Sequence, residues 1–412
     1  MKRNETSQQA RIDQGAPDPT DSSRRGFVKT TAMAAAGVGA AGLPKPSQAE
    51  PAPGAEKGKS AGNGPYAAEG MALYSAQGPH RLLKFQRRAL GPKDVAIQLR
   101  YCGVCHSDIH QGREHWGKDA FPLVTGHELA GVVVAVGSSV SKFKVGSRVG
   151  VGCMVNSCRH CGPCENGMEQ YCENGNVLTY GSTDLDGSMT QGGYATFNVV
   201  DEDFVIAVPD AIDLADAGPM MCAGITVYSP LRHWSIGPGR KVGIVGMGGL
   251  GHMAVKIASA MGAEVTVVTT SAAKVEDARR FGARAVVVNV PGADLSRYKR
   301  SLDFILDTVP YRHDLERLFP LLKLDSTLCI VGVGKITEPH QIGPFSLLRS
   351  RNAFASSAIG GIRETQEAVD FCAVHGIRPE ITRISMSGID DAWNKVVAKE
   401  ARYRFVIDMA NG

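Results

Sequence analysis

The spacing of apolar residues divides the chain into two kinds of region. Up to about residue 222, short apolar runs alternate with glycine-rich turns, as at 128–136 and 193–200, and this pattern predicts strands. From residue 241 onward, apolar runs alternate with helical patterns. Strands are predicted at 241–245, 264–268, 285–289, 304–307 and 327–332, and helices at 252–258, 272–281 and 313–323. Such alternation is typical of a doubly wound parallel sheet, so we expect an α/β protein with a second, β-rich part.

Length and charge narrow the class of protein. A chain of 412 residues with 43% hydrophobic residues is long enough for two or three domains with real cores. The net charge of +4 is concentrated at the start, where residues 1–49 carry seven Lys/Arg against four Asp/Glu. The remainder carries 38 against 37, so a basic face for nucleic acid is not indicated.

The first 65 residues are predicted to lie outside the fold. Segment 23–29, SRRGFVK, resembles the twin-arginine export signal S-R-R-x-F-L-K. The Ala/Gly stretch at 30–43 is too short for a membrane span, which needs about 20 apolar residues. Ser47 and Ala49 offer the small side chains that signal peptidase prefers. We therefore predict a signal peptide at 1–49, a linker at 50–65, and export to the periplasm by the twin-arginine translocase. The alternative is a chance arginine pair in an Ala-rich tail of a cytoplasmic protein.

Four cysteines lie close together in the pattern C-x2-C-x2-C-x7-C: Cys158, Cys161, Cys164 and Cys172. Thiolates so close in sequence can surround one tetrahedral ion without a long loop closure, and four protein ligands make a closed, structural zinc site. An iron–sulfur cluster or a ladder of disulfides is the alternative.

Three separated residues predict a second, open metal site. Cys105, His127 and Cys222 form a Cys2His set, which leaves the fourth position of a zinc ion free for water or substrate. Each residue alone is more typical of a protein core or of an ordinary hydrogen bond. The prediction depends on all three occurring together, with the four-cysteine run between them.

A dinucleotide site is predicted after the apolar run at 241–245. The loop residues Gly246, Gly248, Gly249, Leu250 and Gly251 form a G-x-G-x-x-G motif between a strand and a helix. These glycines allow the backbone and the helix N-terminus to approach a pyrophosphate. The next strand ends in Thr269, Thr270, Ser271 and Lys274, with no acid for a ribose 2′-hydroxyl. Hydroxyls and a cation favour the 2′-phosphate of NADP(H), so we expect NADP(H) as the cofactor and not NAD(H). The alternative is that residues 269–274 form only a polar turn that caps the following helix.

Taken together, the motifs resemble a known family. Six motifs follow one another across residues 66–412: YCGVCHSDIH, TGHELAGVVVAVG, CRHCGPCENGMEQYC, MCAGITVYSPL, GMGGLGHMAVKIA and ARYRFVID. In this order they resemble the zinc-dependent medium-chain alcohol dehydrogenases of the cinnamyl-alcohol-dehydrogenase branch. The resemblance implies a GroES-like catalytic domain at 66–222 and 360–412, a Rossmann domain at 223–359, and a homodimer.

The resemblance also implies roles for single residues. Cys105, His127 and Cys222 match the ligands of the catalytic zinc, and the four-cysteine run matches those of a structural zinc. The remaining matches are Glu128 as an acid near the metal, Asp108 as the carboxylate that orients the ligand histidine, Ser107 at the substrate oxygen, His110 at the end of a proton relay, and Thr226 near the nicotinamide. The implied reaction is hydride transfer between NADP(H) and a primary alcohol or aldehyde, aromatic or medium-chain. The alternatives are a polyol or other secondary-alcohol dehydrogenase, or a non-catalytic zinc- or nucleotide-binding protein.

Overall fold

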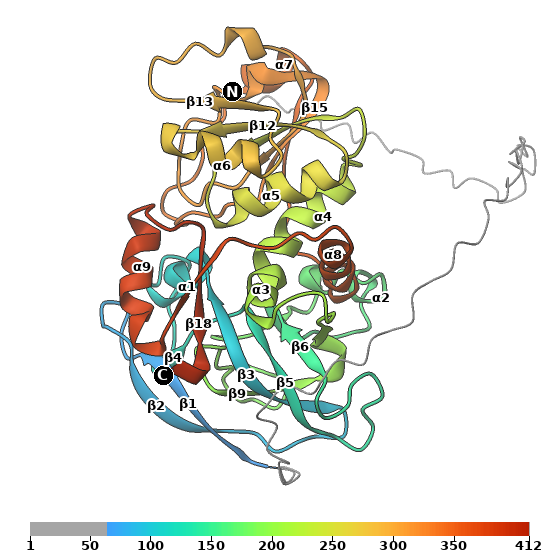
Figure 1. The fold of residues 1–412 in the computed structure, drawn as a ribbon, viewed down its shortest axis with the longest axis vertical. Helices are drawn as coiled ribbons and strands as arrows, with labels where there is room; N and C mark the ends of the chain where they lie inside the picture. Colours follow the sequence, from blue (N-terminus) through green and yellow to red (C-terminus); the bar gives the residue numbers. More distant parts are fainter. Residues whose placement is uncertain (1–63, 412) are drawn as a thin grey trace, which may run out of the picture. The chain divides into compact units, whose positions relative to one another are not determined.

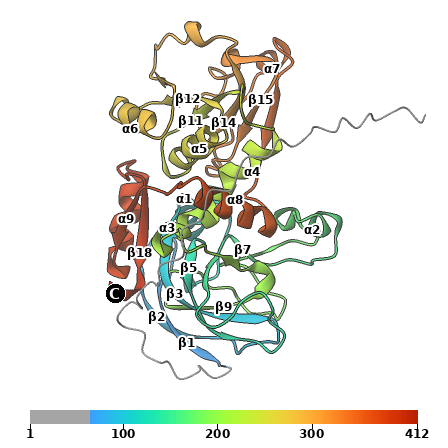
Figure 2. The same cartoon turned by 45° about the vertical axis from the view of Figure 1, so that its right-hand side comes forward.

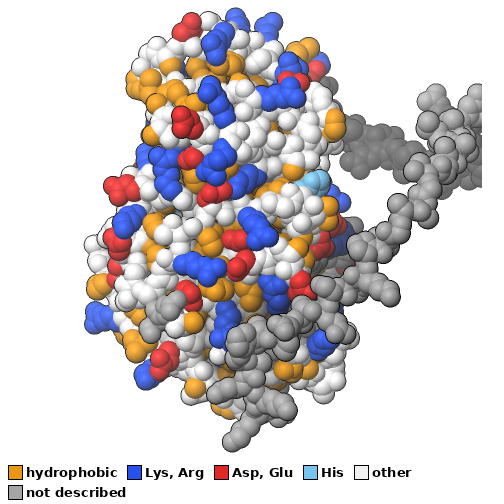
Figure 3. All heavy atoms as spheres, in the orientation of Figure 1, with side chains coloured by type: hydrophobic (Ala, Val, Ile, Leu, Met, Phe, Trp, Pro, Cys, Tyr) orange, Lys and Arg blue, Asp and Glu red, His pale blue; other side chains and the backbone are white. Residues whose placement is uncertain are grey.

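The computed structural model describes residues 64–411, so the predicted signal peptide and nearly all of the linker lie outside the described residues. Within this range, no helix combines the length and the apolar character that a membrane crossing requires. Lys and Arg side chains are interspersed with Asp and Glu on the face drawn in Figure 3.

The first part of the described chain is rich in strands (Figure 1). Its strands are β1 (Tyr66–Leu73), β2 (Arg81–Arg87), β3 (Asp94–Val104), β4 (Leu123–Val124), β5 (Leu129–Val136), β6 (Arg148–Val151), β7 (Met154–Asn156), β8 (Val177–Leu178), β9 (Phe197–Asp201) and β10 (Ile206–Ala207). Its helices are α1 (His106–Gly112), α2 (Gly162–Glu165) and α3 (Leu214–Pro219), followed by the π-helical turn η3 (Met220–Gly224) and α4 (Ile225–His233).

The C-terminal segment completes the main sheet of this part. It contains α8 (Ile362–Val374), β17 (Ile381–Ile384), α9 (Ile389–Val397) and β18 (Arg404–Asp408). The sheet has the order β10-β6-β5-β3-β18-β17, with β9 also paired to β3. Because β18 runs antiparallel to β3, with Phe405 opposite Val104, the end of the chain lies beside the strand that leads into α1.

The middle of the chain forms a six-stranded parallel sheet in the order β13-β12-β11-β14-β15-β16. Figure 2 labels its strands β11, β12, β14 and β15. Its strands are β11 (Lys241–Val245), β12 (Glu264–Thr269), β13 (Ala285–Val288), β14 (Leu302–Asp307), β15 (Leu322–Ile330) and β16 (Ala353–Ser356). The helices α5 (Gly249–Ala260), α6 (Val275–Arg280) and α7 (Pro344–Leu348) and the 3-10 turn η4 (Ala272–Lys274) connect them. This strand order is that of a dinucleotide-binding fold. The predicted combination of a GroES-like part and a doubly wound Rossmann part is confirmed.

Both faces of the parallel sheet are covered, as continuous apolar runs predict. Val242 and Ile244 of β11 belong to one buried apolar cluster, which includes α5 residues such as Val255. Val245 belongs to the cluster on the other side, with Ile305 of β14. Successive side chains of a strand point to opposite faces, so one short run of residues supplies both cores.

One predicted helix is wrong. Residues 313–323 form turns, the 3-10 turn Phe319–Leu321 and the start of β15. Pro320 lies inside the segment and has no N–H to donate, which disfavours a continuous helix. Leu315, Leu318 and Leu322 are nevertheless fully buried in the core, so the apolar spacing was a sign of packing and not of helix.

Candidate active site

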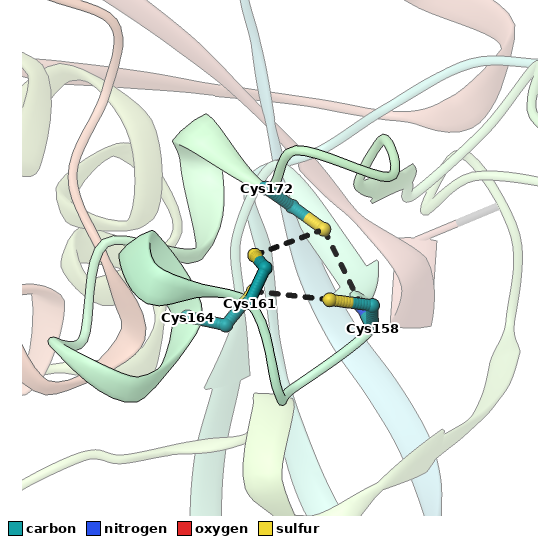
Figure 4. A group of neighbouring side chains, drawn as sticks. All are labelled: Cys158, Cys161, Cys164 and Cys172. Carbon is teal, nitrogen blue, oxygen red and sulfur yellow. Dashed lines mark hydrogen bonds between the residues drawn. The ribbon is translucent and has the colours of Figure 1, made fainter.

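The four-cysteine run forms one compact cluster, drawn in Figure 4. The Sγ atoms of Cys158 and Cys164 are 3.9 Å apart and those of Cys161 and Cys172 are 4.0 Å apart. Two sulfurs bound to one tetrahedral zinc at its usual bond length lie about 3.8 Å apart, whereas a disulfide bond is about 2.05 Å long. The spacing therefore fits four thiolates around an ion, and all four cysteines are free thiols.

Short local elements hold these thiols in place. Cys161 is the residue before α2 and Cys164 lies within it, so one helical turn directs both toward the cluster. Backbone N–H groups of Cys158 and Glu173 donate to the Sγ atoms of Cys172 and Cys161 at 3.5 and 3.4 Å. A hydrogen bond from the Asn174 side chain lowers the pKa of Cys158 to about 5, which favours the thiolate that a metal binds.

The second predicted metal set is also brought together. The ligand atoms of Cys105, His127, Glu128 and Cys222 all lie within 4.8 Å of one another, and all four residues are buried. Cys105 follows β3 and precedes α1, His127 precedes β5, and Cys222 lies in the π-helical turn η3. Because β3 and β5 are neighbours in the sheet, their ends bring Cys105 and His127 side by side.

The chemistry of this set fits a zinc ion. The Sγ atoms of Cys105 and Cys222 are 4.0 Å apart, close to the spacing on a tetrahedral ion. Nδ1 of His127 is 2.8 Å from Oδ1 of Asp108, and Nε2 is buried without a hydrogen-bond partner among the described residues. A buried nitrogen that faces two thiols and has no partner is explained by a metal, because buried polar atoms are otherwise paired.

Asp108 holds His127, the predicted ligand histidine, in position through the Nδ1 atom of the imidazole. It is fully buried in α1, and besides His127 its two oxygens accept hydrogen bonds from the N–H of Cys105 at 2.9 Å, the N–H of Gly126 at 3.1 Å and the hydroxyl of Tyr194 at 3.0 Å. A carboxylate satisfied on both oxygens holds the imidazole in one tautomer and orientation. Tyr194 was not predicted, because a single tyrosine in a sequence is most simply a packing residue.

Glu128 is paired with a residue that the sequence did not indicate. It forms a buried ion pair with Arg404, the first residue of β18, and its Oε2 atom has no partner within the described chain. Burial raises the pKa of Glu128 to about 7, against the attraction of Arg404. A Cβ atom on Gly249 would be 2.6 Å from Nη1 of Arg404, so this arginine also lies against the glycine loop.

The two predicted relay residues lie on α1 but have different neighbours. The hydroxyl of Ser107 is 3.7 Å from Sγ of Cys105, at the open metal set. Nδ1 of His110 is 2.9 Å from Nδ1 of His115, another residue that the sequence reasoning missed, and Trp116 stacks on His110. Burial, with His106 and His115 nearby, lowers the pKa of His110 to about 4, so its imidazole is neutral at physiological pH and can accept a proton.

The glycine loop follows β11 and leads into α5. Gly246 has a φ of +91°, which a side chain would strain, and a Cβ on Gly251 would be 2.1 Å from the carbonyl oxygen of Gly246. Gly248 is the residue before the helix, while Gly249, Leu250 and Gly251 form its first turn. The glycine loop therefore has the conformation that allows its backbone to approach a dinucleotide closely.

The other predicted cofactor residues lie at the end of β12 and in α4. Thr269 is buried and its hydroxyl accepts from the N–H of Ser271, whereas Thr270 is exposed. Lys274 donates to the carbonyl of Met247 in the glycine loop at 2.8 Å. Thr226 is buried in α4, and its hydroxyl has no partner among the described side chains.

A surface pocket of about 530 Å³ lies elsewhere, lined by residues that include Cys164, Phe204 and Arg363. None of the residues predicted for catalysis lines it.

The site agrees with the chain's similarity to known proteins. Residues 91–210 match the alcohol dehydrogenase GroES-like domain, and residues 249–374 match the zinc-binding dehydrogenase domain. NADP-dependent alcohol dehydrogenase C 1 of Mycolicibacterium smegmatis is 50% identical over 341 residues, which cover 82% of this chain and 97% of that protein. The chain belongs to the zinc-binding alcohol dehydrogenase family.

Other members of this family share most of their length with this dehydrogenase. Aldehyde reductase YahK of Escherichia coli is 46% identical over 340 residues, covering 82% of this chain and 97% of that protein. A cinnamyl alcohol dehydrogenase structure from Sorghum bicolor superposes with a TM-score of 0.81 at 38% identity, covering 84% of this chain and 99% of that one. The predicted enzyme class is thereby confirmed.

Proposed function

We propose that this enzyme transfers hydride between NADP(H) and a primary alcohol or aldehyde, aromatic or medium-chain. The observation that carries the proposal is the set of Cys105, His127 and Cys222, whose His127 Nε2 is buried and unpaired. Three protein ligands leave a fourth position for a substrate oxygen, and relatives named NADP-dependent alcohol dehydrogenase and aldehyde reductase share the architecture.

A zinc ion held by these residues would polarise the substrate oxygen as a Lewis acid. Asp108 keeps His127 Nε2 directed at the metal position. Ser107, beside Cys105, is placed to pass a proton to or from the substrate oxygen, and neutral His110 is placed to exchange that proton with the outside through His115. The buried ion pair of Glu128 and Arg404 links the metal surroundings to the glycine loop. The second zinc, on the four-cysteine cluster, has a structural role.

The preference for NADP(H) is supported by the end of β12. Thr270, Ser271 and Lys274 offer hydroxyls and a cation, and residues 269–274 include no acid to repel a 2′-phosphate. Ser271→Asp should therefore lower kcat/KM for NADPH relative to NADH. Equal or better use of NADH by the wild-type enzyme would contradict this preference.

A substrate screen tests the reaction itself. Purified, zinc-loaded enzyme should oxidise NADPH in the presence of aromatic and medium-chain aldehydes, with cinnamaldehyde, benzaldehyde and hexanal as probes. Mannitol with NADP+ is the comparison for the polyol alternative. Turnover with mannitol and none with the aldehydes would refute the proposed substrate class.

We further propose that the enzyme reaches the periplasm by the twin-arginine route. Residues 23–29 support this proposal, and so does the need to load zinc onto free thiols before they meet an oxidising compartment. Replacing Arg24 and Arg25 by Lys should retain the protein in the cytoplasm, because a receptor reads the arginines and not only their charge. An uncleaved N-terminus at Met1 in the whole soluble pool of the wild type would contradict export.

We also propose a homodimer. Strand β16 pairs only with β15 among the described strands, and its Phe354 is 38% exposed. Nearby α7 exposes Phe345 and Leu348 at 72% and 70%. An unpaired apolar edge of this kind is a template for pairing with another chain. Light scattering should give twice the mass of one chain for the wild-type protein. The double variant Phe345→Glu/Leu348→Glu should have the mass of one chain. A wild-type protein with the mass of one chain would contradict the proposal.

A further inference from the structure

An arginine from outside the Rossmann domain contacts η4 and α6, the turn and the helix that follow β12. Arg402 precedes β18, in the C-terminal segment that joins the catalytic sheet. Its Nη1 atom donates to the carbonyl of Ala273 at 3.4 Å and to Oδ2 of Asp277 at 3.0 Å. The hydroxyl of the next residue, Tyr403, donates to the same Asp277 oxygen at 2.5 Å. These contacts hold Arg402 against the turn η4, which follows the predicted cofactor hydroxyls.

The charges around this turn are unbalanced. Asp277 is also paired with Arg280, at 3.0 Å, and the ammonium of Lys274 lies 5.5 Å from the centre of the Tyr403 ring. Arg402, Arg280 and Lys274 therefore all interact with Asp277, and among the described residues only Arg280 of the three has a second carboxylate partner, Glu380 at 3.4 Å. Burial lowers the pKa of Lys274, and repulsion from Arg402 lowers it further, against the attraction of Asp277. An anion bound at the turn would relieve this repulsion.

Arg402 can also reach a ligand. Its side chain is 47% exposed, and both of its hydrogen bonds to the turn use the same nitrogen, Nη1. Thr270, three residues before Ala273, is exposed too. A guanidinium offers five donors in a planar fork that matches phosphate geometry.

We propose that Arg402 binds the 2′-phosphate of NADP(H), together with Thr270, Ser271 and Lys274. The inference rests on the proposed preference for NADP(H). It adds a specificity-determining residue that belongs to the catalytic domain and not to the Rossmann domain. Binding of the phosphate would therefore add a contact between the two domains to those that Arg402 already makes with Ala273 and Asp277, and NAD(H) would not add it.

Dissociation constants of the zinc-loaded enzyme test the proposal. Quenching of protein fluorescence should be titrated with NADPH, NADH and 2′,5′-ADP for the wild type, Arg402→Gln, Arg402→Lys and Arg280→Gln. Arg280→Gln is the matched control, because Arg280 pairs with the same Asp277 but belongs to α6. Melting temperatures of all variants show whether each is folded, and Asp277 retains Arg280 and Tyr403 as partners in the Arg402 variants.

Arg402→Gln should weaken NADPH and 2′,5′-ADP by roughly 10- to 100-fold, as expected for a charged hydrogen bond to phosphate, with NADH changed less than about twofold. Arg402→Lys should recover part of the loss, and Arg280→Gln should change each ligand less than about twofold. If the wild type prefers NADPH but Arg402→Gln keeps the same NADPH-to-NADH ratio, the inference is wrong while the proposed cofactor preference stands. If the wild type binds NADH as tightly as NADPH, both are wrong.

Discussion

Replacing Asp108 by Asn should weaken the catalytic zinc without removing a ligand. The carboxylate accepts four hydrogen bonds, two on each oxygen, from His127 and Gly126 on one side and from Cys105 and Tyr194 on the other. An amide of the same shape has one oxygen and one NH2 group, so two of these four donors lose their acceptor.

The four donors determine which orientation of the introduced amide costs less free energy. If the NH2 faces Cys105 and Tyr194, the tyrosine hydroxyl can rotate to accept, and only the Cys105 N–H is left unpaired. One buried unpaired donor costs about 1–3 kcal/mol. In the other orientation, His127 would have to change its tautomer and lose the lone pair on Nε2. We therefore expect the free energy of unfolding to fall by about 1–3 kcal/mol and zinc affinity to fall roughly 10- to 100-fold, because the charge behind the imidazole is lost.

Competition with a chromogenic chelator measures the zinc affinity of the open site, and urea unfolding measures stability. Tyr194→Phe is the control, since it removes one donor to Asp108 and leaves His127 and Gly126 in place; its zinc affinity should change less than about threefold. A zinc affinity of Asp108→Asn within twofold of the wild type would refute the role assigned to Asp108.

Three further predictions address the other groups. Cys161→Ser should lower the melting temperature and the zinc content, whereas Cys105→Ser should abolish turnover in a protein that stays folded. Equal melting temperatures for Cys161→Ser and the wild type would contradict the structural role of the zinc on the four-cysteine cluster. His110→Ala should slow alcohol oxidation by about 100-fold or less at neutral pH and by less at high pH, where hydroxide can replace the relay; a loss independent of pH would argue against proton transfer. Nε2 of His313 forms an ion pair with Oδ2 of buried Asp307 at 2.8 Å. Burial disfavours the charged imidazole, but Asp307 raises the pKa of His313 above its ordinary value, so the stabilisation is complete below about pH 6.5 and is lost as pH rises through the folded pKa. Urea unfolding should show a larger difference between wild type and His313→Gln at pH 6 than at pH 9, and an equal difference would contradict this.

The sequence predicted what is encoded locally. The four cysteines within 15 residues and the glycine loop between a strand and a helix carry their geometry in their spacing, and both are compact in the structure. The open metal set comes from three distant places, and its prediction depended on all three residues occurring together, with the four-cysteine run between them.

What the sequence did not indicate arises from long-range pairing. Glu128 and Arg404 are 276 residues apart and meet because β18 pairs with β3 beside β5. Tyr194 reaches Asp108, and Arg402 reaches Ala273, through the same kind of distant contact. Periodicity was also misleading at 313–323, where buried leucines pack without forming a helix.

Removal and return of the exchangeable zinc tests the central claim most directly. The pure enzyme should contain two zinc ions per chain, and treatment with dipicolinate should remove one and abolish NADPH oxidation with cinnamaldehyde. One equivalent of zinc should restore the activity, while the second ion stays bound throughout. Full activity in protein that has lost the exchangeable ion, or iron in place of zinc in the pure enzyme, would contradict the account.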